Sequence, residues 1–287
     1  MDAVLITGER RTEVVSVPEP SATPGNAVVE IGLCGICGTD VHAWEAGTPY
    51  PPFLCGHEWF GTVLEGPGTG TRVVMGMPNA CGECDSCKAG HWHRCTAIYS
   101  LFATARHGGY APRISVPAGA LVPVPEALSD VEAAQVEPAT VALHAVRRRP
   151  PRLGDVVVVL GAGPIGLATL QWAKLAGAQR VLVAEPRPAR RALALSLGAD
   201  AAESEVDVVA DVVYDCAGSQ SSMDAACRLA RPGGAVMMVG VSPRDLTVSP
   251  TQWLAKELTV DTSLAHHHHE FEITMRYVAD GQVRLEP

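Results

Sequence analysis

The chain carries four closely spaced cysteines in the stretch CGECDSCKAGHWHRC, residues 81–95. They are Cys81, Cys84, Cys87 and Cys95. Four thiolates in one short loop match the tetrahedral shell of a closed structural zinc site, whereas a redox pair would use only two of them. His91 and His93 lie within the loop and either could replace a cysteine, but the four sulfurs already complete the shell. We therefore predict a structural zinc site with the two histidines as loop residues.

A second set of metal-ligating side chains is dispersed along the chain. It consists of Cys37, His57, Glu58 and Glu137. One thiolate, one imidazole and one or two carboxylates can bind zinc and leave a position open for water or a substrate oxygen, as a catalytic site requires. The spacing alone does not establish this site. Cys37 could be a small buried residue, His57 a hydrogen-bonded core histidine and Glu137 a charge at the start of a helix.

A third motif is rich in glycine. It reads Leu160-Gly161-Ala162-Gly163-Pro164-Ile165-Gly166 and fits G-x-G-x-x-G. The motif follows a run of valines, opens a helical pattern and precedes an acidic residue, Glu185, at the end of the next predicted strand. This context is typical of a dinucleotide-binding site. Gly161 would make the tight turn, and Gly163 would let the backbone approach the pyrophosphate, whose negative charge sits at the helix N-terminus.

The residues after this motif bear on the choice of cofactor. The Glu185 carboxylate can accept hydrogen bonds from ribose hydroxyls and would repel the extra phosphate of NADP, so NAD is favoured. Arg187, Arg190 and Arg191 follow closely, where they could bind that phosphate or simply form an exposed helix face. The predicted cofactor-binding residues are Gly161, Gly163, Pro164, Ile165, Gly166, Glu185 and Arg190.

The predicted secondary structure that positions these residues differs between the two halves of the chain. Residues 1 to about 140 contain short Val and Ile runs separated by Gly and Pro, which is typical of a strand-and-loop domain. After Pro150-Pro151, predicted strands alternate with predicted helices and indicate a parallel sheet with crossover connections. We expect strands at 156–160 and 181–184 and helices at 164–175 and 189–197. The segment 201–211 is too short for a full helical crossover, so one helix should be reduced to a turn.

Length and composition set outer limits. At 287 residues with 47% hydrophobic content, the chain can fill one large core or two ordinary ones. A net charge of -9 argues against nucleic acid or an anionic membrane as a partner, because both reward clustered Lys and Arg. The uncharged run 156–173 contains glycines and a proline, which favour a buried strand, turn and helix over a membrane span. Nothing at the start of the chain marks secretion, so we expect a cytoplasmic protein with reduced thiols.

Five motifs together resemble a known family. In chain order they are CGICGTDVH, GHEWFG, the four-cysteine loop, VEPATVALHAVRR and GDVVVVLGAGPIGLATLQWAKLAGA. They resemble the zinc-dependent medium-chain dehydrogenase/reductase family, the alcohol dehydrogenase superfamily, and Glu137-Pro138 is most similar to its sorbitol and threonine dehydrogenase branch. The resemblance implies an α/β protein with a mainly-β GroES-like catalytic domain at 1–142 and a Rossmann domain with a doubly wound parallel sheet at 143–265. Because the family usually continues further, 266–287 would be an incomplete return to the catalytic domain.

The resemblance also implies roles for the dispersed set. Cys37, His57 and Glu58 would bind a catalytic zinc, and Glu137 would bind it directly or through water. Zinc would act as a Lewis acid that promotes hydride transfer between the substrate and the nicotinamide. Asp40 is expected behind His57, where a carboxylate would set the tautomer of the imidazole.

A proton relay is the remaining part of the expected machinery. Thr39 and His42 match the positions through which the family passes the alcohol proton to solvent, and imidazole suits this step because it titrates near neutrality. The predicted catalytic residues are Thr39, His42 and Glu58. Trp44 and Tyr50 are weaker candidates for lining the pocket. The run His266–His269 is interpreted as a loop, and a role in metal binding has no support in the sequence.

These expectations combine into one function. We expect a zinc-dependent oxidoreductase, with two zincs per chain, that transfers a hydride between NAD(H) and a secondary alcohol or ketone of a polar small molecule such as a polyol, an aminocyclitol or an amino alcohol. The alternatives are an NADP-dependent aldehyde or alcohol reductase and a nucleotide-binding member of the family with weak catalysis. By resemblance alone, a homodimer or homotetramer paired at an edge strand near 258–261 is expected.

Overall fold

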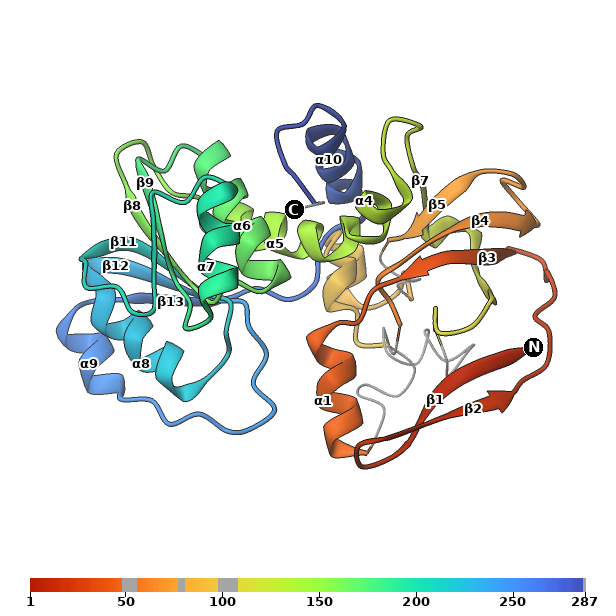
Figure 1. Ribbon diagram of the computed structural model, residues 1–287, viewed down its shortest axis with the longest axis horizontal. Coiled ribbons are helices and arrows are strands. Elements are labelled where there is room, and N and C mark those ends of the chain that lie inside the picture. The colour runs from red at the N-terminus through yellow and green to blue at the C-terminus, as the bar shows by residue number, and fades with distance from the viewer. Residues whose placement is uncertain (48–55, 77–80, 98–107, 286–287) are drawn as a thin grey trace. The chain divides into compact units, whose positions relative to one another are not determined.

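The computed structural model describes residues 1–47, 56–76, 81–97 and 108–285. The chain divides into two compact units. Unit 1 comprises Met1–Glu137 and His266–Glu286, and unit 2 comprises Pro138–Ala265. Each unit has its own main sheet, as Figure 1 shows.

Unit 1 is built from short antiparallel strands. Its five-stranded sheet has the order β6-β3-β4-β5-β7, and β1 and β2 form a separate two-stranded ribbon. In β6, Ile114 and Val116 are buried while their neighbours are half-buried, the alternation expected when one face of a sheet packs on a core. That core includes Val29, Trp59 and Val63. The elements are β1 (Asp2–Gly8), β2 (Arg11–Ser16), β3 (Asn26–Cys34), α1 (Gly38–Ala46), β4 (Trp59–Glu65), β5 (Arg72–Met75), α2 (Asp85–Lys88), η1 (Trp92–Arg94), β6 (Arg113–Pro117), η2 (Ala118–Ala120), β7 (Leu121–Pro123), α4 (Asp130–Ala134) and α10 (His268–Ala279).

Unit 2 contains a six-stranded parallel sheet of order β10-β9-β8-β11-β12-β13. The chain leaves β8 toward one edge and returns at β11 to build toward the other, so right-handed crossovers put α6 and α7 on one face and α8 and α9 on the other (Figure 1). The elements are α5 (Val136–Arg148), which begins in unit 1, β8 (Val156–Leu160), α6 (Pro164–Leu175), β9 (Arg180–Ala184), α7 (Pro188–Ser196), β10 (Ala201–Glu203), β11 (Ala210–Asp215), α8 (Gln220–Leu229), β12 (Ala230–Met238), α9 (Pro250–Ala255) and β13 (Thr259–Thr262).

Most expected elements of unit 2 are confirmed. The strand at 156–160 and the helix at 164–175 match β8 and α6 at both ends. The helix α7 begins and ends one residue earlier than expected, because Pro188 occupies its first turn, where a missing N–H has no cost. The connection from β10 to β11 contains no helix, as its length predicted. The expected edge strand is β13, one residue later than proposed.

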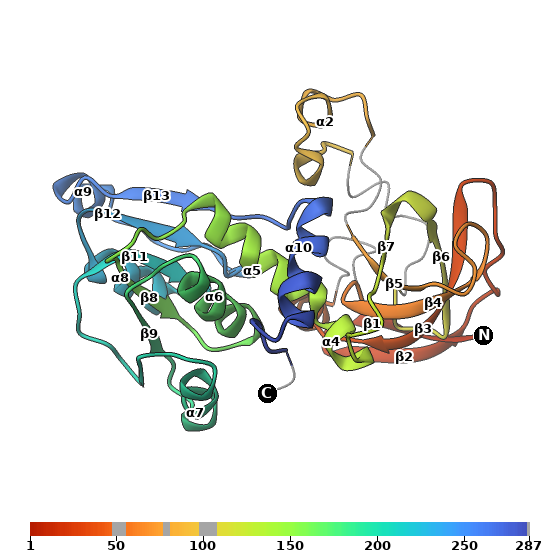
Figure 2. The same cartoon turned by 90° about the horizontal axis from the view of Figure 1, so that it is seen from above.

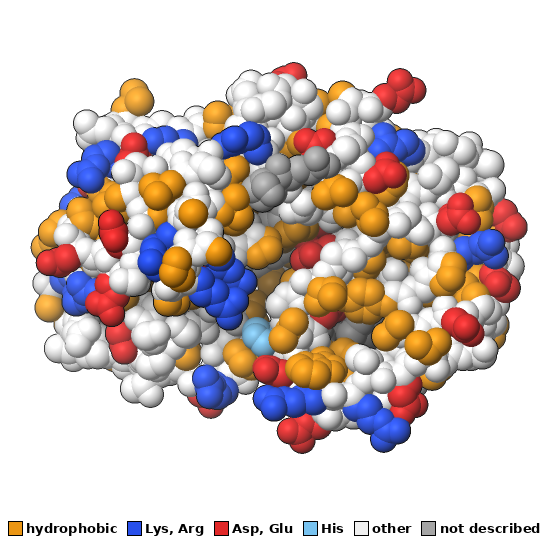
Figure 3. All heavy atoms as spheres, viewed as in Figure 1, with side chains coloured by type: hydrophobic (Ala, Val, Ile, Leu, Met, Phe, Trp, Pro, Cys, Tyr) orange, Lys and Arg blue, Asp and Glu red, His pale blue; other side chains and the backbone are white. Residues whose placement is uncertain are grey.

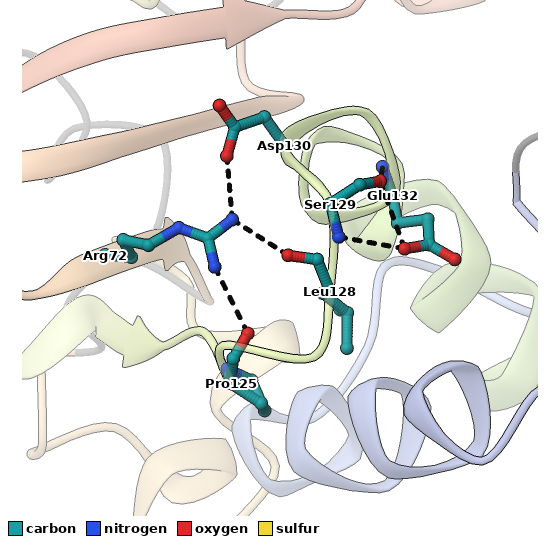
Figure 4. Close-up of polar contacts among 6 residues, drawn as sticks. All are labelled: Arg72, Pro125, Leu128, Ser129, Asp130 and Glu132. Carbon is teal, nitrogen blue, oxygen red and sulfur yellow. Dashed lines mark hydrogen bonds and ion pairs between the residues drawn. The ribbon is translucent and has the colours of Figure 1, made fainter.

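Arg72 joins the sheet of unit 1 to the segment that leads into the helices (Figure 4). Its guanidinium donates hydrogen bonds to the carbonyl of Pro125 at 3.3 Å and to the carbonyl of Leu128 at 2.9 Å. It also pairs with the carboxylate of Asp130 at 2.7 Å and lies 4.9 Å from the ring centre of Phe60. Arg72 thus holds the start of α4 against β5.

A capping box then starts α4. The Ser129 hydroxyl accepts the backbone N–H of Glu132 at 3.1 Å, and the Glu132 carboxylate accepts the backbone N–H of Ser129 at 2.9 Å (Figure 4). Each bond satisfies a helix-end donor that has no partner within the helix. Because α5 follows α4 directly, this capped turn also fixes where α5 begins and therefore where Glu137 lies.

Replacing Arg72 tests which of its contacts stabilises unit 1. We expect Arg72→Met to lower the free energy of unfolding by about 1–3 kcal/mol, since two carbonyls lose a charged donor. Asp130→Ala should cost less than about 1 kcal/mol, because the Asp130 side chain is 62% exposed and its ion pair is screened by water. Denaturant titration would measure both. An equal loss in the two variants would mean that the ion pair, and not the carbonyl bonds, carries the effect.

Candidate functional site

The four-cysteine loop forms a cage within unit 1. The sulfurs of Cys84 and Cys87 lie 3.4 Å apart and those of Cys81 and Cys87 lie 3.8 Å apart. With Cys95 included, all four sulfurs lie within 4.8 Å of one another. A tetrahedral zinc with bonds near 2.3 Å separates its sulfurs by about 3.8 Å, so the spacing fits. None of the cysteines in the described part of the chain forms a disulfide.

The electrostatics of this cage also suit a cation. Backbone N–H groups of Thr96 and Cys87 lower the pKa of the Cys84 thiol to about 6. Desolvation raises the pKa of the neighbouring Cys87 thiol to about 12. One sulfur therefore ionises readily while its neighbour does so only when a positive charge balances it. A divalent metal that binds thiolates supplies that balance.

The dispersed set comes together at one end of the unit 1 sheet. Ligand atoms of Cys37, His57 and Glu58 lie within 4.8 Å of one another. Strands β3 and β4 pair antiparallel with Cys34 opposite Trp59, so the residues after β3 and those before β4 meet at the same end. Gly35 leaves room for this approach, because a Cβ at that position would lie 2.6 Å from Glu58 Oε2.

This group concentrates negative charge. Desolvation, followed by the charge of Glu137, raises the pKa of Glu58 to about 7. Burial opposes ionisation of His57, but a hydrogen bond with Cys37 and the nearby Glu137 charge raise its pKa well above the usual value. The Glu137 charge contributes to both shifts, whereas burial raises the pKa of Glu58 and acts against the rise in the pKa of His57. A bound cation would relieve the repulsion.

A buried carboxylate, Asp40, organises the backbone around the group. Asp40 is 4% exposed. Its Oδ2 accepts the N–H of Cys37 at 2.9 Å and the hydroxyl of Tyr110 at 2.8 Å, and its Oδ1 accepts the N–H of Gly56 at 3.1 Å. Asp40 therefore holds the backbone of Cys37 itself and that of Gly56, the residue before His57. The expected control of the His57 tautomer stays a prediction, and Tyr110 is a contributor that the sequence did not reveal.

Glu137 lies outside the 4.8 Å group, although its charge acts on His57 and Glu58. Its Oε1 is 3.2 Å from Nε2 of His266, which is buried against the ring of Phe271. Burial would raise the pKa of Glu137, but the contact with His266 and the charge of His57 lower it overall. The sequence assigned His266–His269 to a loop, which is wrong for His268 and His269 because α10 begins at His268. Nothing in the local pattern of His266 pointed to Glu137.

The remaining unit 1 candidates are only partly described. Thr39 and His42 both lie on α1 and are half-buried, so the proton relay stays a prediction. Trp44 is half-buried on the same helix. Tyr50 lies outside the described residues.

The glycine motif of unit 2 forms the turn between β8 and α6. Gly161 has a φ of +91°, which favours glycine, and a Cβ on Gly166 would lie 2.0 Å from the carbonyl oxygen of Gly161. A Cβ on Gly163 would meet nothing within 4 Å. Gly161 therefore makes the tight turn, Gly163 leaves the backbone open to a ligand, and Gly166 allows the helix to pack closely on the turn. Pro164 begins α6, followed by Ile165.

A cavity of about 1400 Å³ opens beside this turn within unit 2. Gly161, Gly163, Glu185, Arg187 and Arg190 all line it. Its position beside the C-terminal ends of the parallel strands, where the strand order reverses, is where ligands bind in such sheets. The cavity is large enough for a dinucleotide.

Glu185 is 4% exposed in the wall of this cavity. Its two oxygens accept the backbone N–H groups of Ala162 and Arg187, each at 2.9 Å. The Arg190 guanidinium is 4.0 Å from Glu185 Oε2, whereas Arg191 donates to the carbonyls of Glu185 and Pro186. Of the three arginines, Arg191 is thus occupied by the backbone.

A second buried carboxylate, Asp215, supports the same turn and was missed in the sequence. It accepts the N–H groups of Ala217 and Gly218 at 3.0 and 3.1 Å and the Ser222 hydroxyl at 3.0 Å. Ala217 in turn contacts the glycine turn, since a Cβ on Gly161 would lie 3.2 Å from it. Asp215 is the last residue of β11, and the sequence analysis had predicted no strand there.

The chain matches two known protein domains. The alcohol dehydrogenase GroES-like domain matches residues 23–126, and the zinc-binding dehydrogenase domain matches residues 164–280. L-galactonate-5-dehydrogenase of Escherichia coli strain K12 is 34% identical over 287 aligned residues, which cover 92% of this chain and 83% of that protein. The chain belongs to the zinc-dependent medium-chain dehydrogenase family.

Solved structures show the same fold. A zinc-binding dehydrogenase of Sinorhizobium meliloti 1021 bound to NADP is 31% identical with a TM-score of 0.86, over 99% of this chain and 89% of that one. An alcohol dehydrogenase of Escherichia coli CFT073 complexed with NADH is 28% identical with a TM-score of 0.88, and the match covers 99% of this chain and 89% of that one. The expected family, the GroES-like and Rossmann folds and the assignment as a dehydrogenase are therefore confirmed.

The surface of this dehydrogenase mixes charged and apolar side chains. On the face seen in Figure 3, acidic and basic side chains are interspersed among apolar ones. Within the described residues, every helix is too short or too polar to cross a bilayer.

The glycine turn of the dehydrogenase gives a paired test. Gly163→Ala should leave stability unchanged but weaken NADH binding about tenfold, equivalent to ~1.4 kcal/mol, because its methyl group fills the open approach to the pyrophosphate. Gly166→Ala should instead destabilise the protein by about 1–3 kcal/mol, since its methyl group would overlap the Gly161 carbonyl. Fluorescence titration with NADH and thermal unfolding measure the two effects. Loss of stability in the Gly163 variant would contradict the assignment.

Proposed function

We propose that this dehydrogenase uses NAD and two zincs to interconvert a secondary alcohol and a ketone in a polar small molecule. The convergence of Cys37, His57 and Glu58 carries the proposal, because a thiolate, an imidazole and a carboxylate form an open zinc shell. The substrate class is a polyol, a sugar acid, an aminocyclitol or an amino alcohol. The likeness to L-galactonate-5-dehydrogenase, named for a sugar acid, supports a polyhydroxylated substrate.

The catalytic zinc would be held by Cys37, His57 and Glu58, with Glu137 bound directly or through water. The placement of Glu137 outside the 4.8 Å group favours the route through water. When bound, the zinc supplies a Lewis acid that polarises the substrate oxygen. Cys81, Cys84, Cys87 and Cys95 would hold the structural zinc.

The residues of the chain do the remaining work. Asp40 fixes the backbone on either side of the ligand group through the N–H groups of Cys37 and Gly56. His266 holds the Glu137 carboxylate through its Nε2 atom. The hydroxyl of Thr39 and the imidazole of His42 would pass the alcohol proton to solvent.

NAD is the proposed cofactor, and its nicotinamide would take up or deliver the hydride. The Glu185 carboxylate lies in the cavity wall, where it would accept the ribose hydroxyls and repel an added phosphate. Arg191 is turned toward backbone carbonyls, which leaves Arg187 and Arg190 near that position. Similar dehydrogenases have been seen with NADP and with NADH, so the comparison leaves both open and the Glu185 charge supports NAD.

Zinc content tests the two metal sites separately. Native protein should contain two zincs per chain, and Cys37→Ser and Cys84→Ser should each contain about one. Cys37→Ser should lower NAD reduction with its best polyol or sugar acid more than about 100-fold, because the zinc that would polarise the substrate oxygen is lost. Cys84→Ser should melt at a lower temperature, because structural zinc binding is folding energy. Two zincs in the Cys37 variant would exclude it as a ligand.

The cofactor choice depends on one charge. Glu185→Gln keeps the size of the side chain but removes the repulsion of the extra phosphate, so the ratio of kcat/KM for NADP to that for NAD should rise about tenfold, or ~1.4 kcal/mol. Asp207→Asn, which removes a fully exposed charge in the same unit, is the matched control. An unchanged ratio in the Glu185 variant would show that this carboxylate does not select the cofactor.

A further inference from the structure

Unit 1 contains a histidine cluster that neither zinc set uses. It consists of His91, His93, His267 and His269. The ring centres of His93 and His267 lie 4.3 Å apart, and the ring of His91 lies 6.0 Å from each of them. The ring of His269 stacks on His267 at 5.4 Å. Figure 2 shows the η1 segment, which bears His93, beside the start of α10.

The ring spacing fits a shared metal ion. A tetrahedral ion with metal–nitrogen bonds near 2.0–2.1 Å places the centres of two bound imidazoles about 5 Å apart. The three separations of 4.3, 6.0 and 6.0 Å lie on either side of that value. Ligand nitrogens of His93 and His267 lie within 4.8 Å of each other. No nitrogen of His91 lies within that distance of both, so the exposed side chain of His91 would have to rotate toward them to complete the shell. Zinc, nickel and copper all favour imidazole ligands.

One side of the histidine cluster is buried and the other side is open to solvent. His93 is only 3% exposed, so one ligand is held in place by packing, whereas His91 is exposed and His267 is half-buried. An ion could therefore enter from solvent on the His91 side. The backbone N–H of His267 donates to the buried Glu270 carboxylate at 2.7 Å, which fixes the backbone that bears the ligand.

The other two histidines of the run 266–269 point elsewhere. His266 is paired with Glu137 and packs on Phe271. His268 lies against Gly76, because a Cβ on that glycine would be 2.7 Å from His268 Nδ1. The side chains of the run therefore contact different parts of unit 1.

We propose that His91, His93 and His267 form a third metal site for a divalent first-row ion. His269 supports this site by stacking on His267. The ion would cross-link the four-cysteine loop to the N-terminus of α10, two segments of unit 1 that are far apart in the sequence. An ion bound only by the folded state would stabilise that state, so the site would link metal supply to the stability of unit 1.

Nickel titration of the zinc-loaded protein tests the site. Calorimetry should show one Ni²⁺ bound per chain, with both zincs retained by elemental analysis. His91→Ala and His267→Ala should each weaken Ni²⁺ binding about tenfold or more, since loss of a ligand exceeds the effect of losing an outer contact. His268→Ala is the matched control from the same run and should bind as the native protein does. Added Ni²⁺ should raise the melting temperature of the native protein but not that of His91→Ala.

Three outcomes would overturn the proposal. The native protein could bind no additional Ni²⁺. His91→Ala could bind as the native protein does, which would leave the run 266–269 as an ordinary linear chelator. His268→Ala could weaken Ni²⁺ binding as much as His267→Ala, which would also mean that the run 266–269 binds the ion as a linear chelator. His91 is exposed, so its variant should fold, and circular dichroism with a normal zinc content would verify this.

Discussion

The buried carboxylate of Asp40 is the contact on which the unit 1 site depends. Its two oxygens accept the N–H groups of Cys37, which follows β3, and of Gly56, which precedes β4, and so join two segments at the same end of the β3–β4 pair. A charged acceptor in a poorly solvated place makes stronger hydrogen bonds than a neutral one, and leaving such a charge without donors would be costly. The hydroxyl of Tyr110 adds a third donor. The ligand group can therefore converge although its members repel one another.

In unit 2, buried carboxylates likewise accept backbone N–H groups around the glycine turn. Glu185 and Asp215 are both buried at the ends of parallel strands, and both bind backbone N–H groups of the adjoining loops. These carboxylates hold the turn rigid before any ligand arrives. A preorganised turn matters because ordering a loop during binding would reduce affinity. Glu185 also remains in the cavity wall, where its charge bears on the choice of cofactor.

Metal-ligating groups concentrate in unit 1, and their chemistry differs from site to site. The cage of Cys81, Cys84, Cys87 and Cys95 is all sulfur, the dispersed set mixes sulfur, nitrogen and oxygen, and the histidine cluster is all nitrogen. Sulfur-rich closed shells suit a structural ion, whereas mixed shells suit an ion that must accept a substrate. The lowered pKa of Cys84 favours its thiolate, whereas the raised pKa of Glu58 disfavours its carboxylate unless a cation balances the charge.

Local patterns in the chain predicted the features that depend on neighbouring residues. The four-cysteine spacing, the glycine turn and the extents of β8 and α6 could be predicted, because ligand spacing, turn geometry and periodicity are local properties. Only the tertiary structure decided the contacts of Tyr110 with Asp40, of His266 with Glu137 and of His267 with His93. Each joins residues 70 or more positions apart. Such pairs are set by how sheets and helices pack, and no local pattern encodes them.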